Sequence, residues 1–143
     1  MVEFSTYLKQ IDIKTKALTD RIRFVCDVAS EICPEEIEQI FIADYIKEDN
    51  TRAYESIWFF SERYCLEVKN FETDYNIDIV PIKVYWFEMS LKDYDFKKAT
   101  QKSRLQVSMI FDGQISGSLK AAKENCDVLR DILLKYIKPN LVT

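Results

Sequence analysis

The N-terminal part of the chain carries one apolar stripe with helical spacing. Its members alternate between steps of four and three residues: Phe4, Leu8, Ile11, Thr15, Leu18, Ile22, Val25, Ala29 and Ile32. A period of 3.5 residues is typical of a long packed helix or a coiled-coil seam. Pro34 ends it, because proline disfavours helical geometry in the preceding residue. We therefore predict a helix over residues 4–33. Its second half, Leu18 to Ile32, is more strongly indicated, because residues 11–17 also alternate like a strand.

After Pro34 the apolar residues recur at every second position, as they do in strands with one buried face. The pattern predicts seven strands, over residues 37–46, 54–60, 64–69, 77–82, 84–92, 105–111 and 115–121. Asp112-Gly113 is a favoured two-residue hairpin turn. Pro81 places the fourth strand at a sheet edge or marks its end, because proline cannot donate to a sheet.

The last part of the chain returns to helical spacing. One face is formed by Cys126, Leu129, Ile132, Leu133, Tyr136 and Ile137, and Pro139 stops the helix. With 143 residues and no linker, the chain has the size of one domain, residues 1–143. The sequence thus predicts an α+β fold in which a helix precedes about seven antiparallel strands and a second helix follows them.

This order resembles the pleckstrin-homology-like superfold, including GRAM-type and bacterial members. Residues 57–66 are similar to its second and third strands, and residues 116–137 to its last strand and closing helix. The resemblance covers about residues 35–138 by the strand count. It implies a closed or nearly closed barrel or sandwich that binds peptides, proteins or lipids. The lipid-binding loop of that family corresponds to residues 47–52, where two cations are offset by two acids. Binding of anionic lipid is therefore a third choice for function.

The composition argues against several kinds of partner and active site. The net charge of −4 argues against nucleic acid as a partner. The chain has no histidine, which excludes Ser-His-Asp and Cys-His catalytic groups. It has two glycines, whereas the dinucleotide-binding turn of a Rossmann fold needs three. The four cysteines form no close-spaced pair, so we expect no metal and no cofactor. The chain shows no secretory signal and no transmembrane segment, and we expect a cytoplasmic protein.

Two sets of residues are candidates for binding. The N-terminal stripe predicts an interface, with a homodimer as one outcome, through Phe4, Leu8, Ile11 and Leu18; the alternative is a helix packed on its own domain. Cations in two loops are the candidates for an anionic ligand or an acidic peptide: Lys47, Arg52, Lys97, Lys98, Lys102 and Arg104. The alternative for the second loop is a solvated connection.

Aromatic residues at 58–60 and 85–87 lie on both faces of two predicted strands. One face fills the core, and the other is either covered by the N-terminal helix, which we favour, or exposed as a binding patch. We expect no enzyme but a binding or adaptor domain for a protein or peptide. The chain also resembles the dimeric type III secretion chaperones in size, pI and helix placement, which makes an export or effector chaperone the alternative. A hydrolase that uses Asp93 and Asp95 is the remaining choice.

Overall fold

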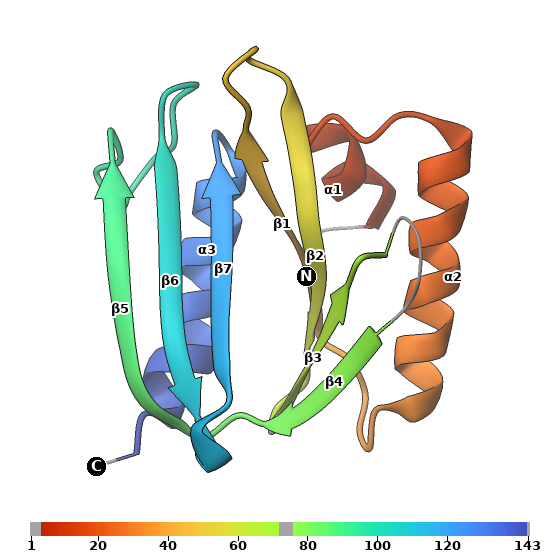
Figure 1. Ribbon diagram of the computed structural model, residues 1–143, viewed down its shortest axis with the longest axis vertical. Helices are drawn as coiled ribbons and strands as arrows, with labels where there is room; N and C mark the ends of the chain where they lie inside the picture. The colour runs from red at the N-terminus through yellow and green to blue at the C-terminus, as the bar shows by residue number, and fades with distance from the viewer. Residues whose placement is uncertain (1–3, 72–75, 143) are drawn as a thin grey trace.

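The computed structural model describes residues 4–71 and 76–142. Figure 1 shows the arrangement of its helices and strands. The elements are α1 (Phe4–Gln10), α2 (Lys16–Ile32), β1 (Gln39–Ile46), β2 (Arg52–Phe60), β3 (Tyr64–Lys69), β4 (Asn76–Pro81), β5 (Val84–Lys92), β6 (Arg104–Phe111), η1 (Asp112–Gln114), β7 (Ser116–Ala122), α3 (Asn125–Ile132), η2 (Leu133–Ile137) and η3 (Lys138–Asn140). The α+β class, the antiparallel strands and the C-terminal helix are confirmed.

The single long N-terminal helix is a wrong prediction. The chain leaves the helix after Gln10, Asp12 takes a left-handed conformation with φ of 67°, and Thr15 is extended before α2 begins. The turn points both Ile11 and Ile13 into one core, which explains the strand-like alternation in this stretch. Two helices, of 7 and 17 residues, therefore pack on the four-stranded sheet in place of one continuous helix.

The strands form two separate sheets, with the order β1-β2-β3-β4 in one and β5-β6-β7 in the other. All pairings within the described sheets are antiparallel. The expected closed barrel is not formed. β7 lies near β1, but the two strands belong to different sheets. In the described residues a side chain connects them: the Ala122 N–H donates to Asp44 Oδ1 at 3.0 Å.

The four-stranded sheet separates two hydrophobic cores. Trp58 and Phe60 face the core that contains α3 and the inner side of the β5-β6-β7 sheet. Phe59 faces the second core, which α1 and α2 cover on the opposite side. Alternation along β2 thus divides its rings between two layers, and the N-terminal helices cover the second face as expected.

The C-terminal helix closes the first core. All six residues of its predicted apolar face are buried. The helix continues from α3 into a π-helical turn, η2, and the chain then folds back to β5. There the Val142 N–H donates to the carbonyl oxygen of Val84 at 2.8 Å, so Leu141 and Val142 pair with the first residue of that strand.

Candidate functional site

β5 is an edge strand with an unusually apolar surface. It is the outer strand of its sheet and lies at the far left of Figure 1; β6 is its partner strand, and Val84 alone also bridges to Leu141. Val84 is buried and Phe87 half-buried, whereas the other residues from Tyr85 to Lys92 are exposed. Exposed hydrophobic edge strands pair readily with other chains, so most soluble proteins protect them. β5 is therefore the first place to look for a binding surface.

The register of β5 shows which face each side chain occupies. Met89 is opposite Val107 and Leu91 opposite Leu105, so both point to the core side. They nevertheless remain 36% and 43% exposed, although Val107 and Leu105 are buried, because β5 is the edge of the sheet and no further strand lies beside it. Trp86 is opposite Ile110 on the other face and is 45% exposed. The strand thus offers apolar side chains on both faces.

The backbone of β5 is also open on its outer side. Half of the N–H and C=O groups of an edge strand point away from its sheet. The C-terminal residues use this side only at Val84. In the described chain, residues 85–92 have no backbone hydrogen bond outside the pairing with β6. The outward-facing N–H and C=O groups of residues 85–92 are therefore available to a partner strand.

The edge of the other sheet differs. β4 has only six residues, contains Asp78 and ends at Pro81. Both residues discourage pairing of edges. β5 has nine residues and no proline, and its charges are Glu88 in the middle and Lys92 at the end. The remaining edge strands, β1 and β7, lie against each other, so of β4 and β5 it is β5 that is suited to accept a strand.

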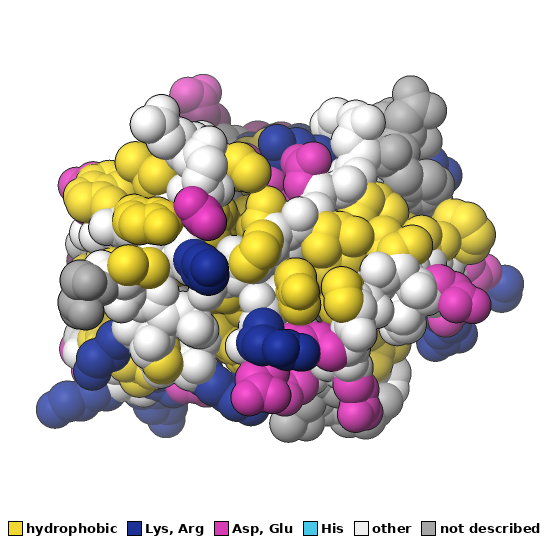
Figure 2. Space-filling model, turned by 90° about the horizontal axis from the view of Figure 1, so that it is seen from below, with side chains coloured by type: hydrophobic (Ala, Val, Ile, Leu, Met, Phe, Trp, Pro, Cys, Tyr) yellow, Lys and Arg dark blue, Asp and Glu magenta, His cyan; other side chains and the backbone are white. Residues whose placement is uncertain are grey.

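The start of β5 adjoins a hydrophobic hollow of about 450 Å³. Tyr85, Ile110 and Phe111 line it together with η1. Figure 2, seen from below, shows hydrophobic side chains gathered in groups on this end of the molecule, with charged side chains between them. Tyr85 is 52% exposed there. Of the two aromatic blocks found in the sequence, the second is left partly uncovered by the protein itself.

The predicted interface residues of the N-terminal stripe lie elsewhere. Leu8 and Ile11 are buried in the core beneath α1 and α2, and Phe4 and Leu18 pack partly buried against the same core. The chain itself therefore covers these side chains, because the break before Lys16 folds α1 back onto the sheet.

Arg52, one of the predicted cations, is engaged inside the protein. Its side chain is 5% exposed, and its Nε donates to Asp44 Oδ2 at 2.5 Å. Its Nη1 donates to Glu124 at 2.8 Å and to Asp12 at 3.0 Å. Asn125 also donates to Asp44, at 2.7 Å. Arg52 thus joins β2 to β1, to the turn after α1 and to the residue before α3, and the prediction that it binds a ligand from a loop is corrected.

The other five predicted cations are not gathered in one place. Lys47 is exposed at the turn after β1. Three lysines, Lys97, Lys98 and Lys102, are exposed on the connection from β5 to β6. Arg104 begins β6, directly opposite Lys92 of β5. The sequence did not single out Lys92, because strand register alone brings it beside Arg104.

The connection after β5 is ordered by acidic side chains. Asp95 Oδ1 accepts hydrogen bonds from the Lys97 and Lys98 amides, each at 2.9 Å. The amides of Lys98 and Lys97 lower the pKa of Asp95. Asp127 of α3 accepts from the Ala99 amide at 3.1 Å. Asp95 therefore stabilises a loop, and this geometry gives no support to acid–base chemistry there.

The described residues show no group of three or more cysteine or acidic side chains arranged to hold a metal ion. No helix in the described part of the chain is long and apolar enough to cross a membrane. Comparison with protein-family models, with curated proteins and with solved structures finds no match to this chain. Its function must therefore be argued from the geometry.

Proposed function

We propose that this protein is a non-catalytic binding module that recognises an extended segment of another protein by adding it as a strand to β5. The observation that carries this proposal is the open edge from Tyr85 to Lys92, with exposed apolar side chains on both faces. In strand addition, backbone hydrogen bonds supply affinity and alternate side chains supply specificity.

The side chains of β5 define the partner. A strand beside β5 would lie about 4.8 Å away, close enough for side chains on the same face to touch. On the core side it would meet Phe87, Met89 and Leu91, which favours apolar residues at alternate positions. On the outer side a basic residue beside Glu88 and an acidic residue beside Lys92 would be favourable.

The expected affinity is moderate. Ordering an extended peptide offsets a large part of the hydrogen bonds and apolar contacts that it gains. We therefore expect a dissociation constant of roughly 1–100 μM for a segment of this length. Weak binding of this kind suits an adaptor that exchanges partners.

The test uses nonapeptides selected from a random displayed set against the full chain. Enriched sequences should carry apolar residues at alternate positions. Met89→Lys should weaken their binding at least tenfold, because it places a charge among the apolar side chains on the core side. Leu134→Lys is the matched control, since Leu134 is a 45% exposed hydrophobic residue outside β5. Equal binding by both variants, or no enrichment, contradicts the proposal.

A second copy of the chain is the other occupant to be tested. Antiparallel pairing of two β5 strands about Met89 would place Leu91 opposite Phe87 of the second copy and avoid contact between the two Glu88 side chains. Light scattering gives the molar mass of the full chain in solution and so distinguishes a monomer from a dimer. A monomer supports the proposal of a separate partner, whereas a dimer that Met89→Lys dissociates contradicts it and favours the chaperone alternative.

A further inference from the structure

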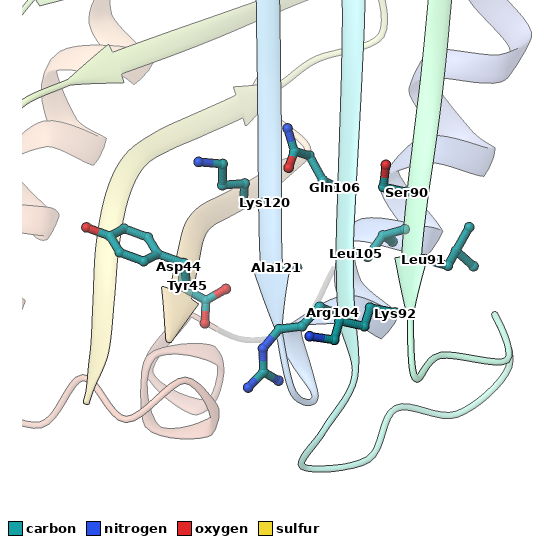
Figure 3. Close-up of a pocket in the computed structure, with 10 residues that line it drawn as sticks. All are labelled: Asp44, Tyr45, Ser90, Leu91, Lys92, Arg104, Leu105, Gln106, Lys120 and Ala121. Atoms are coloured by element: carbon teal, nitrogen blue, oxygen red, sulfur yellow. The ribbon is translucent and has the colours of Figure 1, made fainter. Parts of the chain in front are cut away.

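A second candidate site lies on the outer face of the β5-β6-β7 sheet, beside β1. It is a pocket of about 250 Å³ (Figure 3). Its cations are Lys92, Arg104 and Lys120, and its less polar walls include Tyr45, Leu105 and Ala121. The chain as a whole carries a net charge of −4, whereas this pocket is lined by three cations.

Two of these cations oppose each other directly. Lys92 and Arg104 are partners in the antiparallel register, and Figure 3 shows their side chains on the same side of the sheet. Directly opposite residues have Cβ atoms about 4.5–5.5 Å apart, and like charges in such pairs are destabilising. In the described chain, neither side chain has a carboxylate partner. Arg104 donates instead to the carbonyl oxygens of Ser103 at 2.7 Å and Gln101 at 3.2 Å.

The acidic residue that lines the pocket and the acidic partner of Lys120 are both already engaged. Asp44 contributes to the lining, but Arg52 neutralises it from the other side at 2.5 Å. Lys120 is held by Glu55 at 3.4 Å. The uncompensated charge is therefore positive and belongs to the pair of Lys92 and Arg104. An anion placed between them would relieve their repulsion and accept hydrogen bonds from both.

The pocket also sets the size and character of the ligand. A dry cavity of about 150 Å³ can hold a benzene ring, so 250 Å³ accommodates a ring-sized apolar body together with an anionic group. The Tyr45 ring, which is 41% exposed, offers apolar surface for that body, whereas Leu105 and Ala121 line the pocket with side chains that are buried toward the core. An inorganic anion alone would leave this surface unused.

We propose that this pocket binds a small organic anion, with a phosphate or carboxylate group between Lys92 and Arg104 and an apolar body against the exposed ring of Tyr45. The site shares Lys92 with the edge proposed for strand addition, but it lies on the face of the sheet, and Met89 does not line it. It gives the module a second ligand.

The test is titration of the full chain with phenyl phosphate by calorimetry, with inorganic phosphate and phenol as partial probes. Phenyl phosphate should bind at least tenfold more tightly than either. Lys92→Gln should lower this affinity at least tenfold and, because it removes the like-charge pair, should not lower the thermal midpoint of the free protein. Lys102→Gln is the matched control, since Lys102 is exposed near Arg104 but does not line the pocket. It should bind like the wild type.

Three outcomes overturn the proposal: no binding, equal binding of phosphate and phenyl phosphate, or equal losses in Lys92→Gln and Lys102→Gln. A short phosphotyrosine peptide distinguishes the source of the anion. Binding no tighter than that of phenyl phosphate supports a free small molecule, whereas binding tenfold tighter contradicts it and indicates a modified side chain. Met89→Lys should leave the titration unchanged, so the two proposals can fail independently.

Discussion

The buried ion pair between Arg52 and Asp44 gives a prediction whose magnitude follows from the structure. The perturbation is Arg52→Met, which keeps much of the side-chain volume but removes the charge. Asp44 is fully buried and would keep only two donors, the Ala122 amide and the Asn125 side chain. Removing one partner of a buried pair costs about 3–5 kcal/mol, because the other charge is left uncompensated.

Urea denaturation measures this loss directly. With a slope of about 2 kcal/mol per molar urea for a protein of this size, the midpoint should fall by about 2 M. The control is Arg63→Met, because Arg63 also pairs with a carboxylate, Glu35 at 3.0 Å, but its side chain is 74% exposed. Exposed pairs contribute about 0–1 kcal/mol, so the midpoint of this variant should hardly move.

The pH dependence adds a second condition. Burial raises the pKa of Asp44, although the Arg52 guanidinium opposes this shift. In Arg52→Met the opposition is gone, so the pKa of folded Asp44 rises further above its unfolded value. A raised carboxyl pKa costs stability as pH rises through it, and the loss should therefore shrink in acid. A loss below about 1 kcal/mol, or a loss independent of pH, would refute the account of this network.

Three further predictions concern packing, charge and thiol chemistry. Gly117→Ala should destabilise the fold by about 1–3 kcal/mol in urea denaturation, because a Cβ there would lie 3.0 Å from the Trp58 ring; an unchanged midpoint would contradict this packing. Burial raises the pKa of Glu67, so the charged form of this side chain costs stability at pH 7. Glu67→Gln should therefore raise the thermal midpoint at pH 7 relative to the wild type and lose that advantage near pH 3. A lower midpoint at pH 7 would show that the ion pair with Lys69 dominates. Burial raises the pKa of Cys65 and Cys126 to about 12, so alkylation at pH 8, followed by mass spectrometry, should be at least tenfold slower than in urea; rapid native labelling would show that these thiols are reachable.

Local alternation was sufficient to predict elements that have one buried face. In β6 the residues Leu105, Val107, Met109 and Phe111 are buried as their spacing indicates. The N-terminal break was harder, because Ile11 satisfies both the helical and the strand-like pattern. What breaks the helix is a left-handed residue, Asp12, in a turn whose neighbours Ile11 and Ile13 are buried against the sheet.

The candidate sites depend on contacts between distant segments. Arg52 resembles a loop cation in the sequence, because its carboxylate partners lie at positions 12, 44 and 124. The sequence showed both aromatic blocks, at 58–60 and at 85–87. It did not show that α1 and α2 would cover β2 and leave β5 uncovered. The pairing of Lys92 with Arg104 requires the register of the sheet. The resemblance to the pleckstrin-homology-like plan stays a prediction.

Amide hydrogen exchange of β5, with and without a selected nonapeptide, tests strand addition most directly. In the free protein, the amides between Tyr85 and Lys92 that face away from β6 should exchange quickly, because they have no partner strand. With the peptide bound, alternate amides of this stretch should become protected at least tenfold, while β4 stays unchanged. Protection confined to β4, to the connection after β5 or to the helices would contradict the claim that β5 is the binding edge.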